Sequence, residues 1–324
     1  MSLPPLLQSL SLPVIAAPMF TVSYPDLVVE QCRAGIVGSF PALNARPAAQ
    51  LHDWLTEIDE RLQADRITRP HATQGPLAVN QIIHTSNARL AQDLGVCSDH
   101  RVPILITSLS APPRELIDEV HGYGGIVLHD VIQLRHARKA LEAGVDGLIL
   151  VATGAGGHAG TLSPFALLAE VRAIFDGPLI LSGAIGTGSA ILAAQAMGAD
   201  LAYVGTRFIA TREAQASDAY KQALVQAQAA DITYTDFFTG IKGNYLNASI
   251  IAAGLDPLAL PSSGGKTLKM EHTDARTWKD IWGAGQGVGS IDHILPVAEL
   301  IKQMASEYRQ ATEALAARTG RVVG

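Results

Sequence analysis

The sequence predicts an α/β fold, a closed (β/α)8 barrel of eight parallel strands that alternate with helices. Short apolar runs recur along the first two thirds of the chain, and amphipathic segments separate them. Several of these runs are continuously apolar, as is typical of parallel strands that are covered on both faces. The expected strands are residues 14–17, 35–39, 77–80, 103–107, 126–129, 147–151, 179–182 and 201–204.

The amphipathic segments between these runs predict the helices of the barrel. Ala143-Gly-Val-Asp146 recurs in kind as Met197-Gly-Ala-Asp200, and each indicates a helix that ends at glycine and leads into the next strand. The strict alternation of strand and helix favours a closed barrel over an open sheet. The expected helices are residues 25–34, 47–62, 87–94, 114–121, 134–143, 164–175 and 189–197.

Residues 211–277 interrupt this alternation. They contain helical stretches and a polar, glycine-containing loop at 261–267, but no clear strand. We therefore expect a mainly helical cap at 211–277, inserted into a TIM barrel formed by residues 1–210 and 278–324. A long helix at 296–317 is expected to pack back onto the barrel.

The composition narrows the class of protein. Hydrophobic residues make up 48% of the chain and charged residues 17%, which predicts a sizeable core and argues against disorder. The net charge of −6 and the pI near 5.9 argue against a nucleic acid or a membrane surface as partner. Cys32 and Cys97 suit a reducing compartment, and neither a signal peptide nor a transmembrane helix is expected. We therefore expect a cytoplasmic protein.

Several catalytic motifs do not occur in the sequence. The cysteines are isolated and there is no H-E-x-x-H, so no metal site is expected. The lack of G-x-S-x-G argues against a Ser-His-Asp hydrolase. Gly265-Lys-Thr267 resembles the end of a P-loop, but Leu260 stands where that motif requires glycine.

The stretch ATGAGGHAG at residues 152–160 places His158 among small residues, directly after an expected strand. Gly154, Gly156 and Ala159 match the dinucleotide fingerprint G-x-G-x-x-A. A dinucleotide loop opens a helix on its glycines, however, whereas Ser163-Pro164 sets the helix start several residues later. We therefore interpret the stretch as a loop that a ligand approaches closely, with His158 as a candidate catalytic base. The alternative is a flexible turn.

A barrel of this type takes its ligand groups from the C-terminal ends of the strands and holds phosphate on the loops after strands seven and eight. Those loops, residues 182–186 and 204–207, are rich in small residues whose backbone N–H groups can face an anion. Other strand ends carry Asn80 and the pair His129-Asp130. A phosphate site beside a single histidine requires a phosphorylated substrate or a phosphorylated cofactor.

Short motifs are spread along nearly the whole chain. They are Ala17-Pro-Met19, Val79-Asn80, Ala155-Gly-Gly-His158-Ala-Gly160, Ser182-Gly183, Gly205-Thr-Arg-Phe208, Gly243-Asn-Tyr245 and Trp282-Gly-Ala-Gly-Gln-Gly287. In this order they resemble the nitronate monooxygenase family, formerly called 2-nitropropane dioxygenases. The FMN-dependent enoyl-ACP reductases and the NADH:quinone reductases share the glycine-histidine loop.

The resemblance implies a non-covalently bound FMN whose phosphate lies on Gly183, Gly205 and Thr206, with His158 beside the reactive edge of its ring. It implies oxidation of an alkyl nitronate by O₂ to a carbonyl compound and nitrite. The alternative activity is an NAD(P)H-dependent FMN reductase that acts on a quinone or an enoyl thioester. A further alternative, which is not an enzyme, is a binding barrel that senses a phosphorylated ligand.

The sequence thus yields one candidate site with His158 as its catalytic residue and no metal. Arg207 either pairs with the phosphate or forms a structural salt bridge, and Lys242 and Lys266 either hold an anionic substrate or lie solvated on the surface. The expected partners are the small nitronate substrate and O₂, with a homodimer as one possible assembly. The expected cofactor-binding residues are Ala17, Pro18, Met19, Asn80, His129, Gly156, Gly157, Ser182, Gly183, Ala184, Val204, Gly205 and Thr206.

Overall fold

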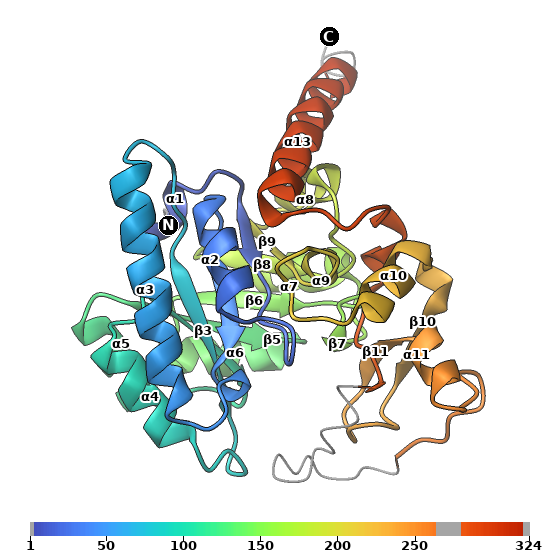
Figure 1. Ribbon diagram of the computed structural model, residues 1–324, viewed down its shortest axis with the longest axis horizontal. Coiled ribbons are helices and arrows are strands. Elements are labelled where there is room, and N and C mark those ends of the chain that lie inside the picture. Colours follow the sequence, from blue (N-terminus) through green and yellow to red (C-terminus); the bar gives the residue numbers. More distant parts are fainter. Residues whose placement is uncertain (1–2, 264–279, 320–324) are drawn as a thin grey trace.

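The computed structural model describes residues 3–263 and 280–319 and contains a sheet of eight parallel strands (Figure 1). Their order around the sheet is β1-β9-β8-β6-β5-β4-β3-β2, and a parallel bridge between Ile15 and Val37 nearly closes the barrel. The expected (β/α)8 barrel is therefore confirmed. The strands are β1 (Val14–Ala16), β2 (Gly38–Pro41), β3 (Leu77–Ile83), β4 (Ile104–Leu109), β5 (Ile126–Val131), β6 (Gly147–Val151), β8 (Leu179–Ser182) and β9 (Leu201–Val204).

Most helices follow the strands and cover the outside of the barrel, whereas α1 precedes β1 and its Leu7 packs with the interior residues of the strands (Figure 1). Each expected helix is present, although the second one begins later and extends further, over Gln50–Thr68. The helices are α1 (Pro5–Gln8), α2 (Pro25–Arg33), α3 (Gln50–Thr68), α4 (Leu90–Asp99), α5 (Arg114–Gly122), α6 (Leu134–Ala143), α7 (Pro164–Arg172), α8 (Gly188–Ala196), α9 (Thr206–Ile209) and α13 (Val297–Thr319). No helix among the described residues is both long and apolar enough to span a membrane.

Side chains along each strand alternate between the barrel interior and the layer beneath the helices. On β5, Ile126 and Leu128 belong to the interior cluster, together with residues of the other strands. Val127 and Val131 belong instead to the cluster that the strands share with the surrounding helices. This alternation decides which polar side chains at the strand ends face the mouth of the barrel.

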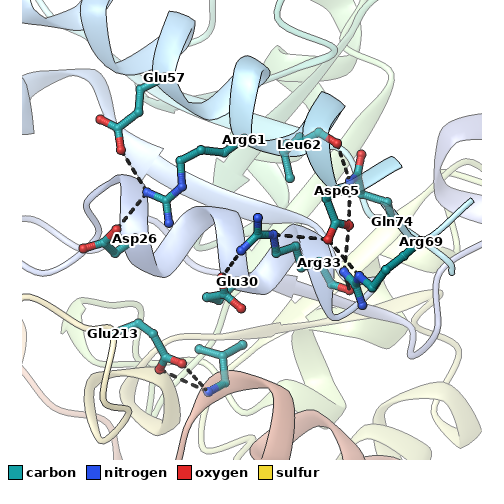
Figure 2. Close-up of polar contacts among 11 residues, drawn as sticks. Asp26, Glu30, Arg33, Glu57, Arg61, Leu62, Asp65, Arg69, Gln74 and Glu213 are labelled. Carbon is teal, nitrogen blue, oxygen red and sulfur yellow. Dashed lines mark hydrogen bonds and ion pairs between the residues drawn. The ribbon is translucent and has the colours of Figure 1, made fainter. Parts of the chain in front are cut away.

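Ion pairs join α2 to α3 on the outside of the barrel (Figure 2). The buried carboxylate of Asp65 accepts from Arg69 at 2.7 Å and lies 3.4 Å from Arg33 of α2. These arginines hold the pKa of Asp65 below its usual range, the hydrogen bond from Arg69 being the largest cause. Elsewhere, both oxygens of Glu213 accept from the Val297 amide at 3.1 Å, which satisfies a free N–H at the start of α13.

The described residues between α9 and α13 lie beside the barrel, in the region where the sequence predicts a cap (Figure 1). Our expectation that 211–277 lacks a strand is wrong, because β10 and β11 form an antiparallel sheet with β7 of the histidine loop. Each cap strand is only four residues long, too short for its periodicity to stand out, and the strand β7 that joins them lies some 85 residues earlier in the sequence. The cap elements are α10 (Asp218–Gln226), β10 (Ile232–Thr235), β11 (Gly243–Leu246) and α11 (Asn247–Ala252), and β7 is Gly157–His158.

The division into a barrel of 1–210 and 278–324 and a cap of 211–277 stays a prediction. Part of the cap loop expected at 261–267, including Lys266, lies outside the described residues.

The predicted C-terminal helix is confirmed as α13, which packs against α8 (Figure 1). The two helices approach so closely that a Cβ at Gly188 would lie 2.0 Å from the Met304 carbonyl oxygen and 2.3 Å from the Tyr308 nitrogen. The Gly188 amide also donates to Glu307 Oε2 at 2.8 Å. Because both clashing atoms belong to the backbone, a side-chain rotation cannot relieve the contact. Glycine is therefore required at this crossing.

Gly188→Ala should lower the free energy of unfolding by about 1–3 kcal/mol, the usual cost of inserting an atom into a packed region. Gly95 in α4 provides the matched control, because a Cβ there has no neighbour within 4 Å. Gly95→Ala should raise the stability by about 0.5–1 kcal/mol through the better helix propensity of alanine. Urea unfolding followed by circular dichroism measures both. Equal effects of the two substitutions would contradict the close crossing.

Candidate active site

A cavity of about 820 Å³ opens at the C-terminal ends of the barrel strands. This is the end at which barrels of this type carry their ligand sites. The cavity wall brings together residues from the loop after β1, from β3, β8 and β9, and from the histidine loop. Of the predicted site residues, those in the wall are Ala17, Pro18, Met19, Asn80, Gly156, Gly157, His158, Ser182, Gly183, Ala184, Gly205 and Thr206.

Two predicted residues, His129 and Val204, do not line this cavity. His129 is 2% exposed, points to the outer layer of the barrel, and has Nδ1 2.8 Å from the Thr107 hydroxyl. Burial lowers the pKa of His129 to about 4, so its imidazole is neutral at neutral pH. The Val204 side chain is fully buried in the core, and its carbonyl accepts from Ala17 N.

The cap clamps the loop that carries His158. Asn244 Nδ2 donates to the Ala155 carbonyl at 2.7 Å, and Tyr234 OH donates to the Ala159 carbonyl at 2.8 Å. Small residues are needed here because other backbone segments approach closely. A Cβ at Gly156 would lie 2.9 Å from the Gly285 nitrogen. These hydrogen bonds and close backbone contacts fix the conformation of the loop, so it is not the flexible turn considered as the alternative.

His158 lies within this clamp, in the cavity wall. Its Nε2 is 2.9 Å from the Thr239 hydroxyl of the cap. Burial lowers the pKa of His158 to about 4, because removal from water disfavours the charged imidazolium. The side chain is therefore neutral at neutral pH and able to accept a proton.

The loops after β8 and β9 form one end of the cavity. Gly183 takes φ +134°, and a Cβ there would lie 2.7 Å from the Thr153 carbonyl oxygen. Thr206 Oγ1 accepts from Gly285 N at 2.9 Å. The turn that follows β9 also places Arg207 in the cavity wall.

Arg207 is the cation at this end of the cavity. Its side chain is buried, Nη1 donates to the His293 carbonyl at 3.3 Å, and Nη2 has no partner among the described residues. None of the ion pairs found in 3–263 and 280–319 includes it. Asp292 and Glu307 act on this guanidinium electrostatically without forming an ion pair, so its unused donor can still take an anionic partner. This end therefore fits a phosphate group.

A polar chain crosses the floor of the cavity from β3 to β5. Asn80 Nδ2 donates to Ser108 Oγ at 2.8 Å, and Ser108 Oγ donates to Asp130 Oδ2 at 2.6 Å. Asp130 Oδ1 and the Tyr203 hydroxyl are buried and have no partner within the described part of the chain. Burial raises the pKa of Asp130 to about 7. Unpartnered buried polar atoms in a cavity wall fit a planar ligand with hydrogen-bonding edges.

Asp130 is the residue that sequence reasoning passed over in favour of its neighbour His129. The alternation of side chains along β5 predicts that Asp130 faces the barrel interior, because Asp130 lies on the same face of the strand as Leu128 and Ile126. Of the neighbours His129 and Asp130, this alternation therefore selects Asp130 as the residue that faces the cavity.

The outer wall of the cavity is apolar with several basic side chains. Arg46 lies 5.2 Å above the centre of the Phe20 ring. Lys242, one of the cap lysines singled out above, lines the cavity with its Nζ 5.9 Å from the centre of the Tyr234 ring. No cluster of three or more metal-ligating side chains occurs among the described residues.

Asp130→Asn should change how stability depends on pH. A carboxyl whose pKa is raised on folding stabilises the native state at low pH, and this contribution is lost as pH rises through about 7. The melting temperature of the variant minus that of the wild type should therefore increase between about pH 5 and pH 8. Differential scanning fluorimetry measures it, with the exposed Asp99→Asn as control. Parallel curves for Asp130→Asn and wild type would contradict the buried neutral carboxyl.

The chain matches the family model described as nitronate monooxygenase over residues 5–307. A nitronate monooxygenase from Paraburkholderia phytofirmans is 29% identical, covering 94% of each chain. A (3aS,4S,5R,7aS)-5-hydroxy-7a-methyl-1-oxo-octahydro-1H-indene-4-carboxyl-CoA dehydrogenase from Rhodococcus jostii is 27% identical over 74% of this chain and 64% of its own.

The fold is also similar to that of a nitroalkane oxidase from Streptomyces ansochromogenes, with a TM-score of 0.76 and 25% identity. That match covers 96% of this chain and 100% of the solved one. The family match extends from α1 into α13 and so includes the residues that line the cavity. The chain belongs to the nitronate monooxygenase family, whose members are flavin-dependent oxidoreductases.

Proposed function

We propose that the protein is an FMN-dependent nitronate monooxygenase that oxidises alkyl nitronates with O₂ to carbonyl compounds and nitrite. The observation that carries the proposal is a neutral, half-buried His158 in the wall of a cavity whose one end fits a phosphate. Membership of the nitronate monooxygenase family supports the same reaction class. Bound FMN supplies the electron transfer between substrate and O₂, which no protein side chain performs.

The cavity residues suit the two ends of FMN differently. Gly183, Gly205, Thr206 and the buried Arg207 offer small side chains, a hydroxyl and a guanidinium to its phosphate. A Cβ at Gly157 would meet nothing within 4 Å, so this position leaves room for the flat ring. The polar floor offers hydrogen bonds to the ring's heteroatoms.

His158 acts on the substrate side in this proposal. A neutral imidazole can take the α-proton of a neutral nitroalkane, while the electron pair of the broken C–H bond stays on the nitro group as nitronate. Its low pKa disfavours the other role, in which an imidazolium pairs with bound nitronate. A nitronate added as such is already ionised and does not need this proton transfer. The histidine should therefore matter for one substrate form and not for the other.

A second candidate is an NAD(P)H-dependent FMN reductase that acts on a quinone or an enoyl thioester. The basic side chains of the outer wall, Arg46 and Lys242 among them, favour a substrate or nucleotide with anionic groups. The Rhodococcus jostii relative, which is named a carboxyl-CoA dehydrogenase, supports a thioester as a class of bound substrate.

His158→Asn should lower turnover of a neutral nitroalkane on the order of 10²–10⁴-fold, the usual contribution of a general base. Turnover of the pre-formed nitronate should change by less than about 10-fold, because no proton needs removal. Oxygen consumption in an electrode measures both substrates. His129→Asn is the control, since His129 is also a neutral imidazole, with the same low pKa, but lies outside the cavity wall. Equal losses on both substrates would rule out the base.

Anaerobic mixing with NADH or NADPH separates the two candidate functions. The purified holoprotein should keep its flavin absorbance with either nucleotide and lose it when an alkyl nitronate is added. A stopped-flow spectrophotometer follows this absorbance. Rapid bleaching by a nucleotide would reject the monooxygenase in favour of the reductase.

A further inference from the structure

The loop that follows β1 forms part of the cavity wall and contains a strained backbone position. Residues 17–22 all line the cavity. Thr21 takes φ +62°, in the left-handed region that a β-branched residue rarely adopts. Such a conformation costs free energy and persists only where neighbouring groups hold it. The structure must therefore supply contacts that fix this turn.

Asn44 supplies those contacts from the next loop of the barrel. It ends the short 3₁₀ helix η1 (Ala42–Asn44) that follows β2, and it is 5% exposed. Its Oδ1 accepts from the Thr21 amide at 3.0 Å, and its Nδ2 donates to the Met19 carbonyl at 3.0 Å and to the Ser23 carbonyl at 2.8 Å. The orientation of the side-chain amide is fixed by these partners, because a backbone N–H can only donate and a carbonyl can only accept. One side chain thus holds both ends and the strained centre of the turn.

The turn also has hydrogen bonds of its own. The Ser23 hydroxyl accepts from the Met19 amide at 3.0 Å, and the Ser23 amide donates to the Met19 carbonyl at 2.9 Å. These two contacts join the ends of the turn and do not involve Thr21. The hydrogen bond that acts on the left-handed residue itself is the one to Asn44.

The turn lies against the end of the cavity that fits a phosphate. A Cβ added at Gly205 would lie 3.4 Å from Ala17 Cβ and 3.7 Å from Met19 Sδ, so both side chains lie close to the loop after β9. Met19 and Gly205 line the cavity and are among the residues expected to contact FMN. Asn44 itself is not among the lining residues. Its effect on a bound cofactor is therefore exerted through the turn.

We propose that Asn44 is a positioning residue of the cofactor site, which holds Thr21 in the left-handed conformation and so fixes Met19 against the loop that carries Gly205. The turn is then formed before FMN binds, and the cofactor does not have to order it. This role rests on the FMN site proposed above, but it does not depend on which substrate the flavin oxidises.

Asn44→Ala should raise the dissociation constant of FMN on the order of 10-fold or more, because the turn is no longer held. Thr21→Gly tests the reason, since glycine adopts positive φ without strain. The loss of affinity caused by Asn44→Ala should therefore be smaller in a Thr21→Gly background than in the wild type. The fluorescence of FMN released on dilution of the holoprotein measures each constant, and circular dichroism checks that each variant is folded.

Arg101 provides the matched control for this coupling. It is also a residue other than glycine with positive φ, +46°, but it is exposed and lies outside the cavity wall. Asn44→Ala should cost the same affinity in an Arg101→Gly background as in the wild type. Wild-type affinity in Asn44→Ala, equal losses with and without Thr21→Gly, or a loss that Arg101→Gly reduces equally would overturn the proposal.

Deuterium exchange of the wild-type holoprotein gives a measurement that needs no variant. The Thr21 amide, followed by NMR, should exchange slowly because Asn44 Oδ1 accepts its hydrogen. Exchange at the rate of an unstructured amide would also overturn the proposal.

Neither measurement uses a nitronate, so the two proposals can fail separately. A protein that shows the predicted coupling but oxidises no nitronate rejects the proposed function and supports the role of Asn44 in holding the turn.

Discussion

The pairing of cap strand β11 with β7 is the contact on which the candidate site depends. It joins a segment some 85 residues further along the chain to the loop that carries His158, with Gly243 directly opposite that histidine. Asn244 and Tyr234 then fix the loop carbonyls, and Thr239 meets the imidazole. Without this sheet, a stretch of alanines and glycines would have no single conformation, because small residues restrict the backbone least.

A second constraint is the alternation of side chains along the barrel strands. It sends Asp130 to the cavity floor and His129 to the layer beneath the helices, although the two are neighbours in the chain. The same burial acts in opposite directions on the two groups, raising the pKa of the carboxyl and lowering that of the imidazole. Both shifts favour the neutral form of the side chain, because a low dielectric disfavours charge. The interior of the barrel thus holds polar groups without holding much charge.

The cavity combines groups that a folded chain does not normally leave without partners. Arg207 Nη2, Asp130 Oδ1 and the Tyr203 hydroxyl are each buried and unpartnered in the described parts of the chain, and each lies in a cavity-lining residue. Leaving such atoms unpaired costs stability, on the order of 1–3 kcal/mol each, which a bound ligand would recover. These atoms lie apart in one cavity, with the guanidinium at one end and the polar oxygens on the floor. One extended cofactor therefore suits the site better than a small ion.

The local sequence was sufficient to predict the barrel. Each of the eight apolar runs, and each glycine that ends a helix, can be recognised from a few neighbouring residues. It also sufficed to select His158 and the small-residue loops, whose place at strand ends follows from barrel topology. The pairing of β11 with β7 and the contact of Thr239 with His158 required the folded chain, because they join distant segments that no window of neighbouring residues contains. For Asp130 and His129, the alternation along the strand holds the signal, and the folded chain shows which of the two faces is inside.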